Sequence, residues 1–193
     1  MVGDLHGLNT LEHQPAKIAA MEALWETQRG APLVLFAIVD EETGTNNYAI
    51  EIPKLASLIL THELDGEVLG IDEFGDDHPP VTPVFIAFRV MVGVGVLMLL
   101  LSWGSLRFLK NPPRALLWCF AGMTFSGWIA VLAGWLTTEI GRQPWLVTGV
   151  LRTAEAAGEA SGAELGASLT GYVLIYSLLL LSYMVVITHL ARR

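Results

Sequence analysis

The stretch that decides the fold is VFIAFRVMVGVGVLMLLLSWGSL, residues 84–106. It is apolar throughout apart from one cation, Arg89, and a helix needs roughly 20 such residues to span a bilayer. Two further runs reach this length, at residues 115–138 and at about 168–190. The 193-residue chain has a mean hydropathy of +0.52 and 53% hydrophobic residues, which is the composition of a membrane protein. We therefore expect an all-α membrane protein with three transmembrane helices.

Charge divides the chain near residue 83. Residues 1–83 hold fifteen Asp and Glu against three Lys and Arg, whereas residues 84–193 hold four against eight. Because so many carboxylates are costly in lipid, we expect an extramembrane region that precedes the three helices. The single cysteine, Cys119, excludes an internal disulfide and a cysteine-based metal site within this chain.

Basic residues indicate which helix ends face the cytoplasm. Residues 107–114, between the first two runs, include three basic and no acidic residues, and the chain ends in two arginines. By the positive-inside rule, residues 107–114 form a cytoplasmic turn and residues 191–193 a cytoplasmic tail. The acidic region 1–83 and the loop at 139–167 then lie on the opposite side of the membrane.

The extramembrane region carries one helix-start signal, at Pro15, because proline suits the first helical turn. After it, Ile18, Met21 and Trp25 recur at helical spacing, which predicts an amphipathic helix with one apolar stripe. The apolar segments that follow are too short to span a bilayer. We expect residues 31–83 to form a folded loop region on the membrane surface with little regular structure.

The first run contains two candidate site residues, the charged Arg89 and Met91 with its polarizable sulfur. Arg89 lies close enough to the start of the run to snorkel to the surface, or it can pair with an anionic group such as a cofactor carboxylate. Met91 lies about 200° round the helix from Arg89. A methionine there either fills a core or serves as an axial haem ligand. The residues themselves leave both alternatives open.

A second group of candidates lies in TTEIGRQPW, residues 137–145, at the end of the second run. Glu139 and Arg142 are three residues apart and can form a salt bridge at the helix end. Trp135 lies one turn before Glu139 on the same helix face. The alternative is therefore that these three side chains line a cofactor pocket.

Lys17 and Glu22 are the charged residues of the predicted amphipathic helix. They are five residues apart, about 140° round the helix, and therefore do not stack on one another. They either lie on a solvated face or hold a small polar ligand from two sides of the apolar stripe. None of the five histidines lies in the middle of a run, so these three helices alone cannot provide two histidine ligands to a haem within the bilayer.

Several strings together resemble one protein family, subunit I of the cytochrome bd ubiquinol oxidases. They match the opening of that subunit's quinol-binding loop, the motif after the loop and a late signature, in the same order and at similar intervals. The strings are GDLHGLNTLEHQPAKIAAME (3–22) with WET (25–27), FRVMVG (88–93), and AGW (133–135) with EIGRQPW (139–145). The resemblance covers essentially the whole chain.

The resemblance implies roles for the polar residues of the loop and the first run. Lys17 and Glu22 match the loop residues implicated in quinol oxidation. Met91 matches the axial ligand of the low-spin haem b558. Arg89 matches the neighbouring arginine that pairs with that haem or tunes it.

The resemblance also implies roles at the end of the second run. Glu139 matches the axial ligand of the high-spin haem b595, and Arg142 and Trp135 match residues close to the centre with two haems. A third haem, haem d, has its ligands mainly outside this chain. The resemblance implies no further catalytic residue.

By this resemblance, the complex is an electrogenic quinol:oxygen oxidoreductase of the bacterial inner membrane. It oxidises quinol on the periplasmic side, where the region 1–83 and the loop 139–167 would lie, and passes electrons through b-type haems to reduce dioxygen to water. The family's subunit I is roughly twice as long, and this chain resembles its C-terminal half, with a quinol loop of the short type.

The implied partners are the missing N-terminal half, subunit II, quinol, dioxygen and the lipid bilayer, and no nucleic acid. The missing half would carry the histidine opposite Met91, so this chain alone is expected to be inactive. The alternative is a non-catalytic membrane scaffold or quinone-binding module derived from that subunit.

Overall fold

The structure, a computed structural model, describes residues 2–108, 110–156, 158 and 161–192. Parts of four predicted segments lie outside the described residues: Met1 of the extramembrane region, Leu109 of the turn, Ala157, Glu159 and Ala160 of the loop, and Arg193 of the tail. The chain divides into two compact units, Met1–Glu155 and Ala156–Arg193, each of which is described by itself.

Three helical segments are long and apolar enough to cross a membrane: Val81–Phe108, Arg114–Ile140 and Gly162–Ala191. They contain the predicted runs 84–106, 115–138 and 168–190 and extend each by a few residues. The predicted fold class, an all-α membrane protein with three transmembrane helices, is confirmed to this extent: the structure is mostly helical and has three candidate spanning helices.

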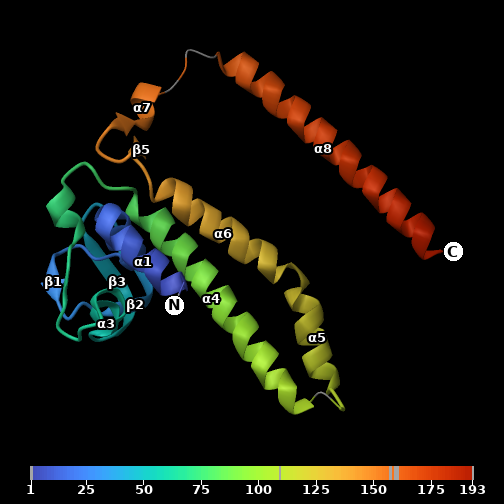
Figure 1. The fold of residues 1–193 in the computed structure, drawn as a ribbon, viewed down its shortest axis with the longest axis horizontal. Helices are drawn as coiled ribbons and strands as arrows, with labels where there is room; N and C mark the ends of the chain where they lie inside the picture. Colours follow the sequence, from blue (N-terminus) through green and yellow to red (C-terminus); the bar gives the residue numbers. More distant parts are fainter. Residues whose placement is uncertain (1, 109, 157, 159–160, 193) are drawn as a thin grey trace. The chain divides into compact units, whose positions relative to one another are not determined.

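The first spanning segment consists of α4 (Val81–Ser105) followed by the 3₁₀ turn η2 (Leu106–Phe108). The second is interrupted: α5 (Arg114–Gly122) and α6 (Ser126–Ile140) are joined by the 3₁₀ turn η3 (Met123–Phe125). Thr124 and Ser126 donate their hydroxyls to the carbonyls three residues earlier, which is how such side chains compete with the regular helix ladder. In the first unit, α6 packs along α4 (Figure 1).

The extramembrane region begins with two helices, α1 (Val2–His13) and α2 (Pro15–Glu22). As predicted, α2 starts at Pro15. It ends earlier than the apolar stripe suggested, because Ala23 adopts a left-handed conformation and its N–H bonds to carbonyls of the last turn. Trp25 therefore lies beyond the helix, where its indole N–H donates to Asn46 Oδ1 at 3.0 Å.

The expectation of little regular structure in residues 31–83 is wrong. Strands β2 (Leu33–Asp40) and β3 (Thr45–Ile52) form an antiparallel hairpin, and β1 (Gln28–Arg29) pairs with β4 (Glu67–Val68). Helix α3 (Leu55–Thr61) and the 3₁₀ turn η1 (Ile71–Phe74) complete the region. The polar cluster after residue 39 is the hairpin turn: Asp40 Oδ1 accepts the backbone N–H groups of Glu42 and Thr43, and Gly44 has φ +63°.

The core of the first unit joins α2, β2 and the first turns of α4. Its buried residues are Ala19, Ala20, Ala23, Val34, Ala37, Ile71, Val81, Val84 and Phe85. The small alanines of α2 let its backbone approach α4 closely. The start of α4 is therefore fixed against the extramembrane region.

A carboxylate from the hairpin turn caps α4. The helix has no side-chain cap of its own at Pro80, but Glu41 Oε1 accepts the backbone N–H of Thr82 at 2.8 Å. Burial alone would raise the pKa of Glu41, but the hydrogen bonds from Thr82 and Val81 outweigh it and hold that pKa below its ordinary value. The positive end of the helix dipole favours such a carboxylate.

After α6, the chain forms a short hairpin of β5 (Trp145–Val147) and β6 (Leu151–Arg152), and then α7 (Thr153–Ala156). The Arg152 guanidinium pairs with Asp77 and lies 4.9 Å from the centre of the Trp145 ring. This pair attaches the hairpin to the segment that precedes α4.

The second unit consists of α8 (Gly162–Ala191) and the residues described around it. Its start is a capping box, in which Ser161 and Glu164 exchange hydrogen bonds between side chain and backbone. No described side chain of α8 is buried.

Candidate functional site

The larger cavity of the first unit brings together residues that are far apart in the sequence. It has a volume of about 690 Å³ and is lined from α1, α2, β2, α3, α4 and α6. Four of the predicted site residues line it: Lys17, Glu22, Arg89 and Met91. A cavity of this size is typical of a site for a small ligand or cofactor.

Glu22 and Arg89 form a buried ion pair at the edge of this cavity. Glu22 Oε2 lies 2.5 Å from Arg89 Nη2, and the two side chains are 9% and 14% exposed. Arg89 therefore does not snorkel to water. Its guanidinium also lies 5.1 and 5.2 Å from the ring centres of Phe85 and Phe88. Burial raises the pKa of the Glu22 carboxyl, and the charge of Arg89 opposes this shift without cancelling it.

One polar atom of this pair lacks a partner. Arg89 Nε is buried and has no hydrogen-bond partner among the residues that the structure describes. A buried N–H of a cation without an acceptor is costly. An anionic or hydrogen-bond-accepting group in the cavity would satisfy it.

The side chain of Met91, a residue of α4, lies against α6. A Cβ atom added at Gly134 would stand 2.8 Å from Met91 Sδ, so the glycine leaves room for the thioether. The sulfur thus lies against the bare backbone of α6 and lines the larger cavity.

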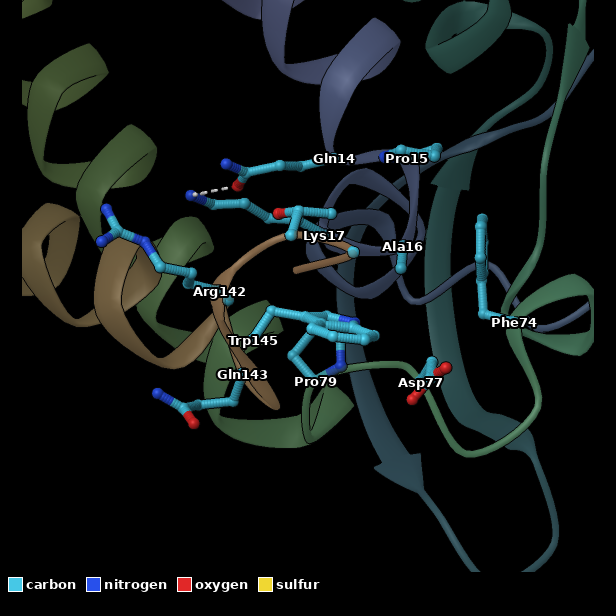
Figure 2. Close-up of a pocket in the computed structure, with 13 residues that line it drawn as sticks. Gln14, Pro15, Ala16, Lys17, Phe74, Asp77, Pro79, Arg142, Gln143 and Trp145 are labelled. Carbon is cyan, nitrogen blue, oxygen red and sulfur yellow. Dashed lines mark hydrogen bonds between the residues drawn. The ribbon is translucent and has the colours of Figure 1, made fainter. Parts of the chain in front are cut away.

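Lys17 lines both the larger cavity and a smaller one of about 260 Å³ (Figure 2). Its Nζ lies 3.5 Å from Gln14 Oε1 and 3.5 Å from the Thr138 carbonyl oxygen. Burial lowers the pKa of Lys17, and the nearby Arg142 charge lowers it further, while Glu139 acts in the opposite sense.

The smaller cavity is lined by the end of the second spanning segment and by the extramembrane region. Arg142, Gln143 and Trp145 come from the chain after α6, and Gln14 and Asp77 come from the extramembrane region. Lys17 and Arg142 thus line one cavity.

The structure does not bring Trp135, Glu139 and Arg142 together. Trp135 is 60% exposed, Glu139 is also exposed, and neither lines either of these two cavities. The ion pairs among the described residues do not include one between Glu139 and Arg142, so the salt bridge at the helix end is not formed. The three side chains therefore do not share either of these two cavities.

Comparison with known proteins gives a family. The family described as cytochrome bd terminal oxidase subunit I matches residues 1–193, the whole chain. The chain belongs to this family. The resemblance inferred from the sequence is thus confirmed.

Similar proteins come from several bacteria. The chain is 35% identical over 170 residues to cytochrome bd ubiquinol oxidase subunit 1 of Bacillus subtilis (strain 168). This match covers 80% of this chain and 36% of that protein. It is 27% identical over 262 residues to cytochrome bd-II ubiquinol oxidase subunit 1 of Escherichia coli (strain K12). That match covers 99% of this chain and 51% of that protein.

A solved structure shares the fold. The bd oxidase from Geobacillus thermodenitrificans matches with a TM-score of 0.81 at 32% identity, over 100% of this chain and 45% of that chain. The chain thus spans between 36% and 51% of the length of the two curated relatives.

Family membership implies haem, and the described residues can be tested for their fit to it. They contain no group of three or more His, Cys, Asp or Glu side chains that could hold a metal ion by itself. A haem needs only axial ligands from the protein, and Met91 offers a thioether in a cavity of suitable size. The partnerless Arg89 Nε lies on the same helix, where an anionic cofactor edge would satisfy it. This part of the subunit I chain therefore fits the group.

Some residues of the site were missed in the sequence. The Met91 side chain packs against Gly134, and the Lys17 side chain packs against Gly141. Asp77 and Arg152 form an ion pair beside the smaller cavity. The seven-residue spacing of the two glycines was a usable signal, because it places both on one helix face. No signal in the sequence links Asp77 to Arg152.

Proposed function

We propose that this chain forms the C-terminal part of subunit I of a bd-type terminal oxidase and contributes its quinol site. One observation carries the proposal: Lys17 and Glu22 of α2 and Arg89 and Met91 of α4 line one cavity. These are the four residues that the resemblance assigns to quinol oxidation and to haem b558. A scaffold would not need this group of polar residues beside lipid.

In this proposal, Lys17 donates a hydrogen bond to the quinol, and Glu22 receives its two protons in turn and passes them to the periplasmic side. Oxidation of a quinol releases its two hydroxyl protons together with two electrons. The raised pKa of Glu22 brings this carboxyl closer to neutral pH, where proton transfer is efficient. The Arg89 guanidinium holds the Glu22 carboxylate in place.

Met91 would hold haem b558, with Arg89 beside it. Glu139 would hold haem b595, near Arg142 and Trp135, and the exposed Glu139 carboxylate is free to bind such a group. Haem d would have its ligands mainly outside this chain. When bound, the haems would supply electron transfer and dioxygen reduction to water.

The proposed complex contains the N-terminal half of subunit I and subunit II, and it lies in the bacterial inner membrane. The region 1–83 and the loop 139–167 would be periplasmic, and the turn 107–114 and the tail 191–193 cytoplasmic. The chain alone would not reduce dioxygen, because the larger share of the haem ligands would come from the rest of subunit I.

Replacement of the proposed haem ligand tests this function. In the assembled oxidase, we expect Met91→Leu to abolish the low-spin b-type signal in the reduced-minus-oxidised spectrum, because leucine has no sulfur ligand. Met98→Leu is the matched control: Met98 lies seven residues along the same helix, does not line the cavity and is 40% exposed. An unchanged low-spin signal in Met91→Leu would contradict the assignment. An assembled wild-type complex that binds quinone but shows no haem signal would support the alternative of a quinone-binding module.

A further inference from the structure

Three glycines of the second spanning segment lie on one face of α6 and its end. Gly127, Gly134 and Gly141 are seven residues apart, and seven residues are close to two helical turns. Their surroundings differ. A Cβ atom at Gly127 would meet no atom within 4 Å, whereas one at Gly134 would meet Met91 and one at Gly141 would meet Lys17.

Gly141 is in close contact with the aliphatic part of Lys17. A Cβ atom at residue 141 would come closest to the Thr137 carbonyl oxygen, and it would also stand 3.0 Å from Lys17 Cγ and 3.1 Å from Lys17 Cε. Gly141 itself is buried. The stem of the lysine thus lies on bare backbone.

The charged end of Lys17 is held at the same helix end. Its Nζ lies 3.5 Å from the carbonyl oxygen of Thr138 in the last turn of α6. The last carbonyls of a helix lack partners within it and carry the negative end of its dipole, so they attract a cation. Gln14 Oε1 provides the other contact of Nζ.

Lys17 is the residue of this contact that lines both cavities. Gly141 lines only the smaller of the two. A side chain at residue 141 would therefore press the lysine stem away from α6, and Nζ would move relative to the larger cavity.

We infer that Gly141 is a positioning residue for Lys17: because it has no side chain, the lysine stem packs on the end of α6 and its ammonium is held at the Thr138 carbonyl. The effect on quinol rests on the proposed function, in which Lys17 binds quinol from the larger cavity. The contact between Gly141 and Lys17 thereby connects two motifs that are separate in the sequence, GRQPW and the quinol-loop string.

The experiment is a double-mutant cycle between residues 141 and 17 in the assembled oxidase. Gly141→Ala is made in the wild type and in a Lys17→Ala background, with Gly127→Ala as the control in open space. Each variant is measured for Tm, for the haem spectrum, and for KM and kcat with decyl-ubiquinol.

We expect Gly141→Ala to raise KM for decyl-ubiquinol about 5- to 10-fold with kcat nearly unchanged, because a hydrogen bond from a charged group is weakened in binding. In the Lys17→Ala background, Gly141→Ala should raise KM no further and should lower Tm by less, because the stem it displaces is gone. Gly127→Ala should change neither quantity.

Two results would overturn the inference. One is an equal loss of Tm from Gly141→Ala in both backgrounds, which would assign the glycine to the Thr137 carbonyl alone. The other is a KM that Lys17→Ala raises and Gly141→Ala does not. If the Tm losses are coupled but Lys17→Ala leaves KM unchanged, the seating of Lys17 stands and the proposed quinol site is wrong.

Discussion

The two ends of α4 are both largely apolar but have different surroundings. Val81, Val84 and Phe85 at its start are at most 2% exposed, whereas Val96 and Leu100 further along are 49% and 61% exposed. The difference comes from the partner surface, because the alanines of α2 and strand β2 cover the start of α4 and leave the later turns bare. Hydropathy predicts that a helix spans the membrane, but it does not distinguish a helix face that packs against protein from one that contacts lipid.

The comparison extends to the charges. The Glu22–Arg89 pair lies beside the covered start of α4 and is buried, whereas the Lys54–Asp65 pair of the extramembrane region is 52% and 73% exposed. Buried and exposed pairs should differ sharply in their contribution to stability. Variants of the chain purified in detergent test this contrast.

The largest expected effect comes from removing one member of the buried pair. Glu22→Leu should lower the free energy of unfolding by about 3–5 kcal/mol, because Arg89 then stays buried without a counter-charge. Denaturant unfolding followed by circular dichroism measures the loss.

Two variants control this prediction. Glu22→Leu combined with Arg89→Met should regain most of the stability, because no unpaired charge remains. Asp65→Leu, which breaks the exposed pair, should cost less than about 1 kcal/mol. A double variant as unstable as Glu22→Leu alone would show that the loss is not due to the uncompensated charge.

A smaller effect is expected from a cavity at the start of α4. Val84→Ala should cost about 2 kcal/mol, because it removes buried methyl groups and leaves space that the close alanines cannot fill. Val131→Ala in α6 is the matched control, since Val131 is 66% exposed. Equal losses of unfolding free energy in the two variants would remove the distinction between the covered and the bare surfaces.

The smallest effect is expected at the cap of α4. Glu41→Ala should cost about 1 kcal/mol, because the Thr82 N–H loses its acceptor at the helix start. Glu42→Ala changes the neighbouring exposed glutamate and should leave the midpoint of thermal unfolding unchanged. If both variants unfold at the wild-type temperature, the hairpin turn does not stabilise α4.

The spanning helices could be predicted because each depends on local composition. Residues 84–106, 115–138 and 168–190 are long apolar runs, and all three lie within observed helices. The hairpin of β2 and β3 was missed because its polar turn resembles an irregular loop. Antiparallel pairing between Leu33 and Ile52 is a contact at a distance, which no local pattern encodes.

For the candidate site, too, the residues could be predicted from the sequence but their partners could not. Lys17, Glu22, Arg89 and Met91 were selected from the sequence because charge and sulfur beside apolar runs are unusual and because their strings resemble one family. That Arg89 pairs with Glu22, and that Glu139 and Arg142 do not pair, could not be predicted, since the choice of partner depends on how α2 and α6 dock on α4.

By itself, then, the sequence determined the membrane class, the three helices, the family and the residue types of the site, because these depend on composition and on motifs along the chain. The tertiary structure decided which of these residues share a cavity, which charge is buried with which, and why residues 134 and 141 are glycines. The physical reason is that burial, ion pairing and close backbone approach depend on distances between segments, and the packing of α2 and α6 against α4 sets those distances.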